Sequence, residues 1–126
     1  MRMAIPVWRS RVSPVFDAAE ELLVSDFENG REFYRTRCSM RGLSVEQRAN
    51  QLAELDVDVL LCGAISRSLE NLVGASGIKV IPWVRGEVDG VLVWYLNGMP
   101  ADTQLFMPGC ARRRQKRERR RMRGQP

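Results

Sequence analysis

One short apolar run near the middle of the chain constrains the fold more than any other feature. Residues 59–62 (Val-Leu-Leu-Cys) form a continuous apolar run, which is too short for a helix and is bounded by Asp58 and Gly63. Such a run is typical of a β-strand that is covered on both faces, as in a parallel sheet. After it, Gly63 and Ala64 turn the chain, and Ser66 is placed to cap a helix that begins at the next residue.

This arrangement predicts a ligand site. A buried strand, a turn of small residues and a helix N-terminus bring the Cys62 thiol and free backbone N–H groups to one place. In open α/β sheets, anionic ligands bind at such places because the N–H groups and the helix dipole favour negative charge. We therefore expect the binding site around residues 62–67.

The chain begins with a predicted strand. Residues 3–8 form a first, mostly buried strand, and Pro6 weakens it or lies where one ladder N–H is not needed. Residues 9–14 then form a polar loop that ends in a proline turn. Residues 15–19 are ambiguous between a loop and a short helical turn.

A hairpin follows. Residues 21–27 predict a second strand, and Asn29-Gly30 between two extended segments is the strongest short hairpin signal. Residues 32–40 alternate, with Tyr34, Thr36, Cys38 and Met40 on one face. This alternation predicts a half-exposed antiparallel strand at a sheet edge, with Cys38 packed toward the core.

Three helices and one more strand complete the domain. Ser44 and Gln47 match a capping box, which predicts a helix over residues 45–55. Apolar spacing predicts two further helices after Ser66 and after Glu87, and a buried strand over residues 78–82 lies between them. The fold class is thus α/β, a mixed five-stranded sheet with an antiparallel hairpin on one side and parallel βαβ units on the other. This is the ribonuclease H-like arrangement.

The charge is divided unevenly along the chain. Residues 112–123 hold nine basic residues and one acid, whereas residues 1–111 hold 11 basic and 14 acidic residues and have a net charge of −3. The sequence therefore predicts a mildly acidic domain over residues 1–111 and a strongly basic tail over residues 112–126.

The reactive residues that the chain contains, and those that it lacks, exclude several kinds of catalytic and metal site. The three cysteines form no CxxC pair, and the chain has no histidine. This excludes a Ser-His-Asp triad, a Cys-His dyad and imidazole-ligated metals. Residues 3–8 hold no carboxylate for the Mg²⁺ ions of a ribonuclease H-type nuclease, and no Gly-rich phosphate loop is present. We expect a protein that is not an enzyme.

No segment predicts a membrane span or a leader. The longest uncharged stretch, residues 90–101, has 12 residues, which is too short to cross a bilayer. The apolar run at residues 3–8 is short for a signal peptide. A cytoplasmic location is expected.

Three segments resemble one known family. Residues 11–19 (RVSPVFDAA), 62–70 (CGAISRSLE) and 82–86 (PWVRG) are similar to motifs of the dinitrogenase iron–molybdenum cofactor biosynthesis family, which includes NifX-type carriers and the C-terminal part of NifB-type proteins. The resemblance covers residues 2–110, and residues 107–110 (MPGC) are similar to the end of some stand-alone members. It implies a non-catalytic domain that binds, carries or shields an anionic metal–sulfur cluster.

The sequence departs from the family at one motif. Many members have His-Phe-Gly where this chain has Val15, Phe16 and Asp17, and the histidine is a candidate cluster ligand. Since Val15 cannot coordinate a metal, direct histidine ligation is excluded.

Two sets of residues are candidates for binding a cluster. Cys62 and Cys110 could supply soft thiolates, although Cys62 is equally well explained as an ordinary core residue. An anion pocket is expected in the three loops at the strand ends, and any single arginine there could also be an ordinary solvated side chain. Trp8 and Trp83 could form the walls. The pocket residues are Arg9, Ser10, Arg11, Gly63, Ala64, Ser66, Arg67 and Arg85.

The basic tail has three interpretations. It could be a solvated extension, a polybasic arm that contacts phosphates without sequence preference, or a segment that screens a charged cluster. Its basic residues are Arg112, Arg113, Arg114, Lys116, Arg117, Arg119, Arg120, Arg121 and Arg123.

Two functional hypotheses follow. In the first, the domain carries or stores an iron–molybdenum-type cluster and meets a cofactor-assembly protein. In the alternative, it binds no cluster and contacts nucleic acid or an acidic protein through the tail. The edge strand over residues 32–40 would also allow dimerisation.

Overall fold

A computed structural model describes residues 1–100 of the chain. Cys110, the predicted domain boundary after residue 111 and the basic tail lie outside the described residues. No helix within residues 1–100 is long and apolar enough to cross a membrane. The elements are β1 (Arg2–Trp8), β2 (Arg11–Val12), the 3₁₀ turn η1 (Phe16–Ala18), β3 (Glu21–Glu28), β4 (Arg31–Ser39), α1 (Val45–Glu54), β5 (Val59–Leu61), α2 (Arg67–Ala75), β6 (Lys79–Ile81) and α3 (Val88–Leu96).

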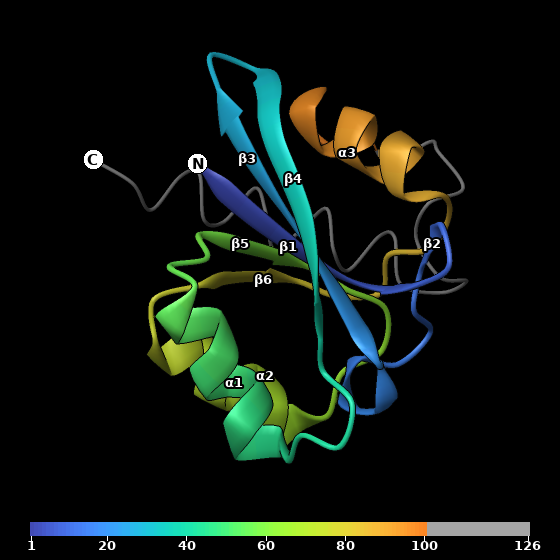
Figure 1. Cartoon of the computed structure of the whole chain (residues 1–126). Helices are drawn as coiled ribbons and strands as arrows, with labels where there is room; N and C mark the ends of the chain where they lie inside the picture. The colour runs from blue at the N-terminus through green and yellow to red at the C-terminus, as the bar shows by residue number, and fades with distance from the viewer. Residues whose placement is uncertain (101–126) are drawn as a thin grey trace.

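A mixed sheet forms the centre of the molecule, with helices on both faces. The strand order is β4-β3-β1-β5-β6, and β2 pairs with β1. The helices α1 and α2 cover one face and α3 covers the other, as Figure 1 shows. Strands β1, β5 and β6 are parallel, and the β3–β4 hairpin is antiparallel. The α/β class, the mixed sheet and the three helices agree with the sequence analysis.

The sheet has six strands rather than the expected five. The additional strand, β2, lies in the segment for which the sequence predicts a polar loop. Arg9 has a positive φ of 59°, which turns the chain back so that Val7 pairs with Val12. A two-residue strand after a tight turn has no hydrophobic period of its own, so the sequence pattern does not reveal it.

Pro6 lies where no ladder N–H is needed. It pairs with Leu22 of β3 in register, and its carbonyl accepts a hydrogen bond from the Ser13 N–H at 2.8 Å. In an extended strand the N and the carbonyl of one residue point to the same side. The nitrogen of Pro6 therefore faces the side of β1 on which β5 and β2 pair. It lies between the residues that pair with β5 and those that pair with β2, where no ladder N–H is required.

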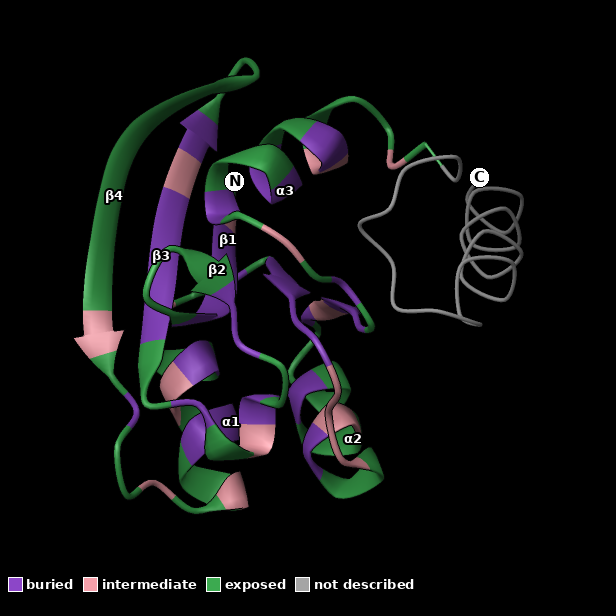
Figure 2. Ribbon diagram, turned by 90° about the vertical axis from the view of Figure 1, so that its right-hand side faces the viewer, coloured by how far each residue is buried: buried purple, intermediate pink, exposed green. Residues whose placement is uncertain are grey.

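The edge strand β4 differs from its prediction. The sequence predicts a half-exposed strand, but eight of its nine residues are exposed and only Cys38 is partly buried. Phe33 and Tyr34 are 65% and 57% exposed. Figure 2 shows β4 exposed along most of its length, as expected for the outermost strand of the sheet. The edge position itself agrees with the prediction.

The helix starts follow their sequence signals. Ser44 and Gln47 form the predicted capping box at α1, with the Gln47 N–H donating to Ser44 Oγ at 3.2 Å and the Ser44 N–H donating to Gln47 Oε1 at 2.8 Å. Ser66 caps α2 by accepting a hydrogen bond from the Leu69 N–H at 3.2 Å. Side-chain caps of this kind typically stabilise a helix by about 1 kcal/mol.

Gly63 allows two loops to approach each other closely. A Cβ atom at this position would lie 2.6 Å from the Pro14 carbonyl oxygen and 2.7 Å from that of Ser13. Both of these atoms belong to the backbone, so they cannot move away as a flexible side chain would. The approach therefore requires a glycine.

We predict that Gly63→Ala lowers the free energy of unfolding by about 1–3 kcal/mol, because the methyl group forces the loops apart. Gly74→Ala is the matched control: it lies within α2 and a Cβ there meets no atom within 4 Å. That change should raise the stability by up to about 1 kcal/mol through helix propensity. Urea unfolding of both variants measures the difference, and equal stabilities would contradict the steric account.

Candidate anion-binding site at the carboxyl edge of the sheet

Three loops meet at the carboxyl edge of the parallel strands. The loop after β1 is tied to the turn after β5, because the Ala64 N–H donates to the Pro14 carbonyl at 2.8 Å and the Phe16 N–H donates to the Ala64 carbonyl at 2.9 Å. The loop after β6 joins them through the Trp83 N–H, which donates to the Gly63 carbonyl at 3.0 Å. The sequence analysis expected these loops to line one site, and the structure brings them together.

The Cys62 thiol lies in the core. The residue is 0% exposed and packs among apolar side chains of the α1–α2 face, including Phe16 and Leu69. In this conformation a cluster in solvent has no path to the sulfur. Residues of β5 alternate between the two buried faces of the sheet, and Cys62 directly follows the strand, so its side chain points to the α1–α2 face like that of Leu60.

The N-terminus of α2 already holds an anion from the chain itself. The two carboxylate oxygens of Asp17 accept hydrogen bonds from the Ser66 N–H at 2.9 Å and from Ser66 Oγ at 2.5 Å. The expectation of free N–H groups at this turn is therefore wrong for Ala64 and Ser66, both of which have partners within the chain. The loop that supplies these acceptors lies about 50 residues earlier in the sequence, so no local pattern indicates it.

A buried arginine fixes the turn that carries Asp17. The Arg48 side chain is 5% exposed, and its Nη1 donates to the carbonyls of Phe16 at 3.2 Å and Ala19 at 2.6 Å. Its Nε donates to the Leu43 carbonyl at 3.1 Å. Burial lowers the pKa of Arg48, and the nearby Asp17 charge partly offsets that effect. Arg48 thus connects α1 to η1.

Two more predicted pocket residues are engaged with a carboxylate. Ser10 Oγ and Arg11 Nη1 contact the two carboxylate oxygens of Glu87 at 2.9 and 3.0 Å. Glu87 is the residue at the N-cap of α3, so these contacts connect the β1–β2 turn to that helix. Of the remaining three, Arg67 is exposed in the first turn of α2 and Arg85 is exposed on the loop after β6.

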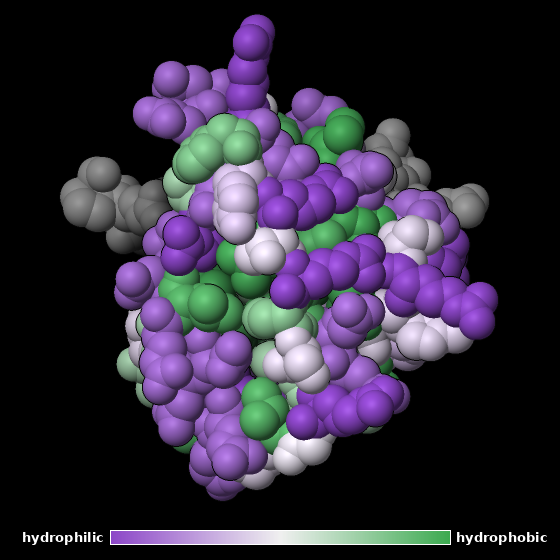
Figure 3. Space-filling view, in the orientation of Figure 1, coloured by the Kyte–Doolittle hydropathy of each residue, from purple (hydrophilic) through white to green (hydrophobic). Residues whose placement is uncertain are grey.

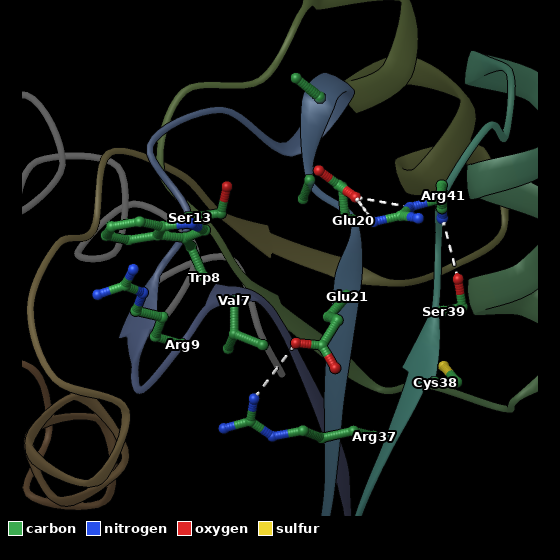
Figure 4. Close-up of a pocket in the computed structure, with 12 residues that line it drawn as sticks. Val7, Trp8, Arg9, Ser13, Glu20, Glu21, Arg37, Cys38, Ser39 and Arg41 are labelled. Carbon is green, nitrogen blue, oxygen red and sulfur yellow. Dashed lines mark hydrogen bonds and ion pairs between the residues drawn. The ribbon is translucent and has the colours of Figure 1, made fainter.

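The open groove of this edge lies on the hairpin side, between β1 and β4. Its volume is about 610 Å³, and Arg9 is the one predicted pocket residue in its lining. Figure 4 shows its polar side chains, which come from the β1–β2 turn and from the facing ends of β3 and β4. We call it the β1–β4 groove. Its charged, aromatic and thiol side chains are Trp8, Arg9, Glu20, Glu21, Arg37, Cys38 and Arg41.

Three arginines and two glutamates determine the charge of the β1–β4 groove. Arg41 Nη2 lies 2.7 Å from Glu20 Oε2, and Arg37 Nη1 lies 3.5 Å from Glu21 Oε1. The Arg9 guanidinium stacks over the Trp8 ring at 4.6 Å from its centroid, a cation–π contact. The groove therefore carries a net positive charge within an otherwise acidic domain.

Cys38 borders the groove, but its side chain lies on the α1–α2 side of the sheet, opposite to that of Arg37, and packs against the core there. Burial raises the pKa of Cys38, and the Gln51 amide, whose Nε2 lies 4.0 Å from the sulfur, opposes that rise. The thiol is therefore protonated at neutral pH in the described conformation. No group of three or more His, Cys, Asp or Glu side chains that could hold a metal ion occurs within residues 1–100.

The sequence analysis missed Arg37, Cys38 and Arg41 as site residues. Its prediction that Cys38 packs toward the core is confirmed, and it treated the arginines as the outer face of an edge strand. One signal was available: β4 runs parallel to β1 in a hairpin sheet, so its last residues must reach the same edge as the loop after β1. Figure 3 shows hydrophilic side chains interleaved with apolar ones on the face that carries β4.

The sequence matches the model of the family described as dinitrogenase iron-molybdenum cofactor over residues 1–98. The chain belongs to this family. The match covers all three loops at the carboxyl edge and the whole β1–β4 groove. Among curated proteins, none matches the sequence.

Solved structures share the fold. The crystal structure of PH0822 is 21% identical with a TM-score of 0.73, over 78% of this chain and 92% of that one. The apo form of the orange protein from Desulfovibrio gigas is 22% identical with a TM-score of 0.67, over 78% and 88%. A protein from Methanocaldococcus jannaschii is 17% identical with a TM-score of 0.64, over 79% and 90%. At these identities the likeness concerns the fold.

We predict that Asp17→Ala lowers the free energy of unfolding by about 1–2 kcal/mol, because the N–H and hydroxyl of the cap residue Ser66 lose their acceptor. Asp17→Asn should lose less, since its amide oxygen can still accept the Ser66 N–H hydrogen bond. Thermal unfolding of both variants measures the difference. An alanine variant as stable as the parent protein would show that the Asp17–Ser66 contact does not stabilise the loop.

Proposed function

We propose that this protein binds, carries or stores an anionic metal–sulfur cluster of the iron–molybdenum type in the cytoplasm and passes it to a cofactor-assembly protein. Membership of the family over residues 1–98 is the observation that carries the proposal. The arginines at the carboxyl edge support it, because guanidinium groups bind multiply charged anions through charge and N–H donation.

We further propose that the protein is a carrier rather than an enzyme. For the ribonuclease H-like arrangement that we assign to the sheet, the known chemistry is hydrolysis with carboxylate-bound Mg²⁺. Within β1 (Arg2–Trp8) there is no carboxylate. Asp58 precedes β5 at the opposite edge, where its carboxylate accepts the Arg2 N–H hydrogen bond at 2.8 Å.

The geometry favours capture by charge over thiolate ligation. Cys62 is fully buried, and the thiol of Cys38 has a raised pKa. The arginines of the edge are instead exposed and come from separate elements, so several can contact one anion. A cluster held in this way can be transferred without breaking metal–protein bonds.

We predict that protein reconstituted anaerobically with iron, molybdate and sulfide retains stoichiometric metal and charge-transfer absorption bands after desalting. Cys62→Ala should keep both, because the buried sulfur does not contact the cluster. Elemental analysis with a visible spectrum is the measurement. Protein that stays colourless and metal-free would contradict the proposed function, and loss of colour in a folded Cys62→Ala variant would assign that thiolate as a ligand.

The basic tail supports a second candidate function, nonspecific contact with a polyanion or an acidic protein. Nine basic residues within residues 112–123 can neutralise phosphates, and the segment has no aromatic residue for base stacking. The two functions are compatible, because they use different parts of the chain.

Deletion of residues 112–126 should abolish binding to a labelled single-stranded RNA at 50 mM salt. The full chain should bind it with an affinity that falls steeply with salt, since each neutralised phosphate adds a slope of about −0.7 in log–log form. Fluorescence anisotropy measures both. Equal binding by the two proteins would rule out the tail as the contact.

A further inference from the structure

The β1–β4 groove holds its cationic side chains in weak, replaceable pairs. The Arg37–Glu21 pair has side chains 41% and 48% exposed, and the Arg41–Glu20 pair has side chains 79% and 62% exposed. Exposed ion pairs of this kind stabilise a fold little, because water screens them. The arginines can therefore change partner at low cost.

The third arginine of the groove, Arg9, has no carboxylate partner within the described residues. Across residues 1–100, no carboxylate lies within ion-pair distance of Arg9, whose guanidinium stacks on Trp8. Arg9 lies in the β1–β2 turn, whereas Arg37 and Arg41 lie in and just after β4, on the other wall of the groove (Figure 4). In Figure 4 the Arg37 and Arg41 side chains extend over the groove toward Glu21 and Glu20, and Arg9 adds a third positive charge at the opposite rim, where its guanidinium stacks on Trp8.

We propose that the β1–β4 groove is where the anionic cargo binds, and that Glu20 and Glu21 are internal competitors that occupy Arg41 and Arg37 when the cargo has left. This inference rests on the proposed function. It names the surface that binds the cluster and the residues that help to release it. Each glutamate satisfies one arginine, whereas a multiply charged anion in the groove contacts all three arginines at once. The exchange therefore favours the cargo, while the glutamates limit its affinity and allow transfer.

The remaining lining suits a sulfur-rich anion. Val7, Ala18 and Ala19 supply apolar surface beside the arginines. A volume of about 610 Å³ is large enough for a small cluster. Weakly hydrated thioanions lose less than oxyanions when they contact such a surface. We therefore infer a preference for thiomolybdate over molybdate or sulfate.

The test uses the full chain and tetrathiomolybdate as the probe, with binding measured by isothermal titration calorimetry. Arg37→Gln/Arg41→Gln should weaken binding by about tenfold or more, because two of three charge-assisted contacts are lost. Glu20→Gln/Glu21→Gln should strengthen it by about threefold or more, because the competitors are removed. Molybdate and sulfate should bind the parent protein more weakly than the thioanion.

Matched controls lie at the other end of the same hairpin. Glu28 and Arg31 pair in register on β3 and β4, far from the groove. Arg31→Gln and Glu28→Gln each remove one charge of the same sign as the corresponding double variant, which removes two, and they should leave the dissociation constant within about twofold, since surface charges at that distance are screened. Thermal unfolding confirms that each variant is folded.

Three outcomes would overturn the inference. Variants of both pairs that bind like the parent protein would show that the anion binds elsewhere, with the proposed function intact. If the arginine variant binds more weakly but the glutamate variant does not bind more tightly, Glu20 and Glu21 do not compete with the cargo. If Arg31→Gln weakens binding as much as the groove variant, the effect comes from the overall charge of the protein and not from the groove. A parent protein that binds no thiomolybdate would instead contradict the proposed function itself.

Discussion

The hydrogen bonds between the loop after β1 and the turn after β5 determine what the carboxyl edge can bind. Gly63 lets the backbone of residues 13–14 approach, and the Asp17 carboxylate then occupies the N-terminus of α2. Arg48 holds the same loop from the side of α1. Because Asp17 already occupies the N–H and hydroxyl donors of Ser66, an anionic ligand finds fewer donors at this helix, and the arginines elsewhere on the edge become the stronger candidates.

The hairpin provides those side chains. Strand β4 lies at the exposed sheet edge, so Arg37 stays in contact with water, whereas Arg35 pairs with Asp89 of α3. Its last residues reach the edge where the β1–β2 turn projects Arg9 and Trp8. The position of the groove thus follows from the antiparallel hairpin that the family fold adds to the parallel strands. A carrier benefits from such a position, since a partner can approach from the open side.

Sequence patterns predicted the features that depend on neighbouring residues. The Ser44 and Ser66 caps, the Asn29-Gly30 turn and the buried strand β5 each follow from a local signal, and all are present. Features that depend on distant pairing were missed. The partner of Asp17 is 49 residues away, and β2 exists only because Arg9 adopts a left-handed turn.

The candidate site was predicted in part for the same reason. The sequence predicted that the loops after the parallel strands meet at one edge, and they do. Arg9, one of the predicted pocket residues, lines the β1–β4 groove at that edge. It could not show that Ser10 and Arg11 contact Glu87, since that contact depends on where α3 begins in space. The sequence did not indicate that Arg37 and Cys38 line a groove, because the alternation of residues 32–40 is the pattern of any edge strand.

The most direct test of the central claim is a two-dimensional ¹H–¹⁵N NMR titration of the full chain with tetrathiomolybdate. The account predicts that amide signals of Trp8, Arg9 and residues 37–41 shift, whereas those of Ser66 to Leu69 stay in place because Asp17 occupies that helix end. Shifts concentrated at residues 66–69, or no shifts within residues 1–100, would contradict it.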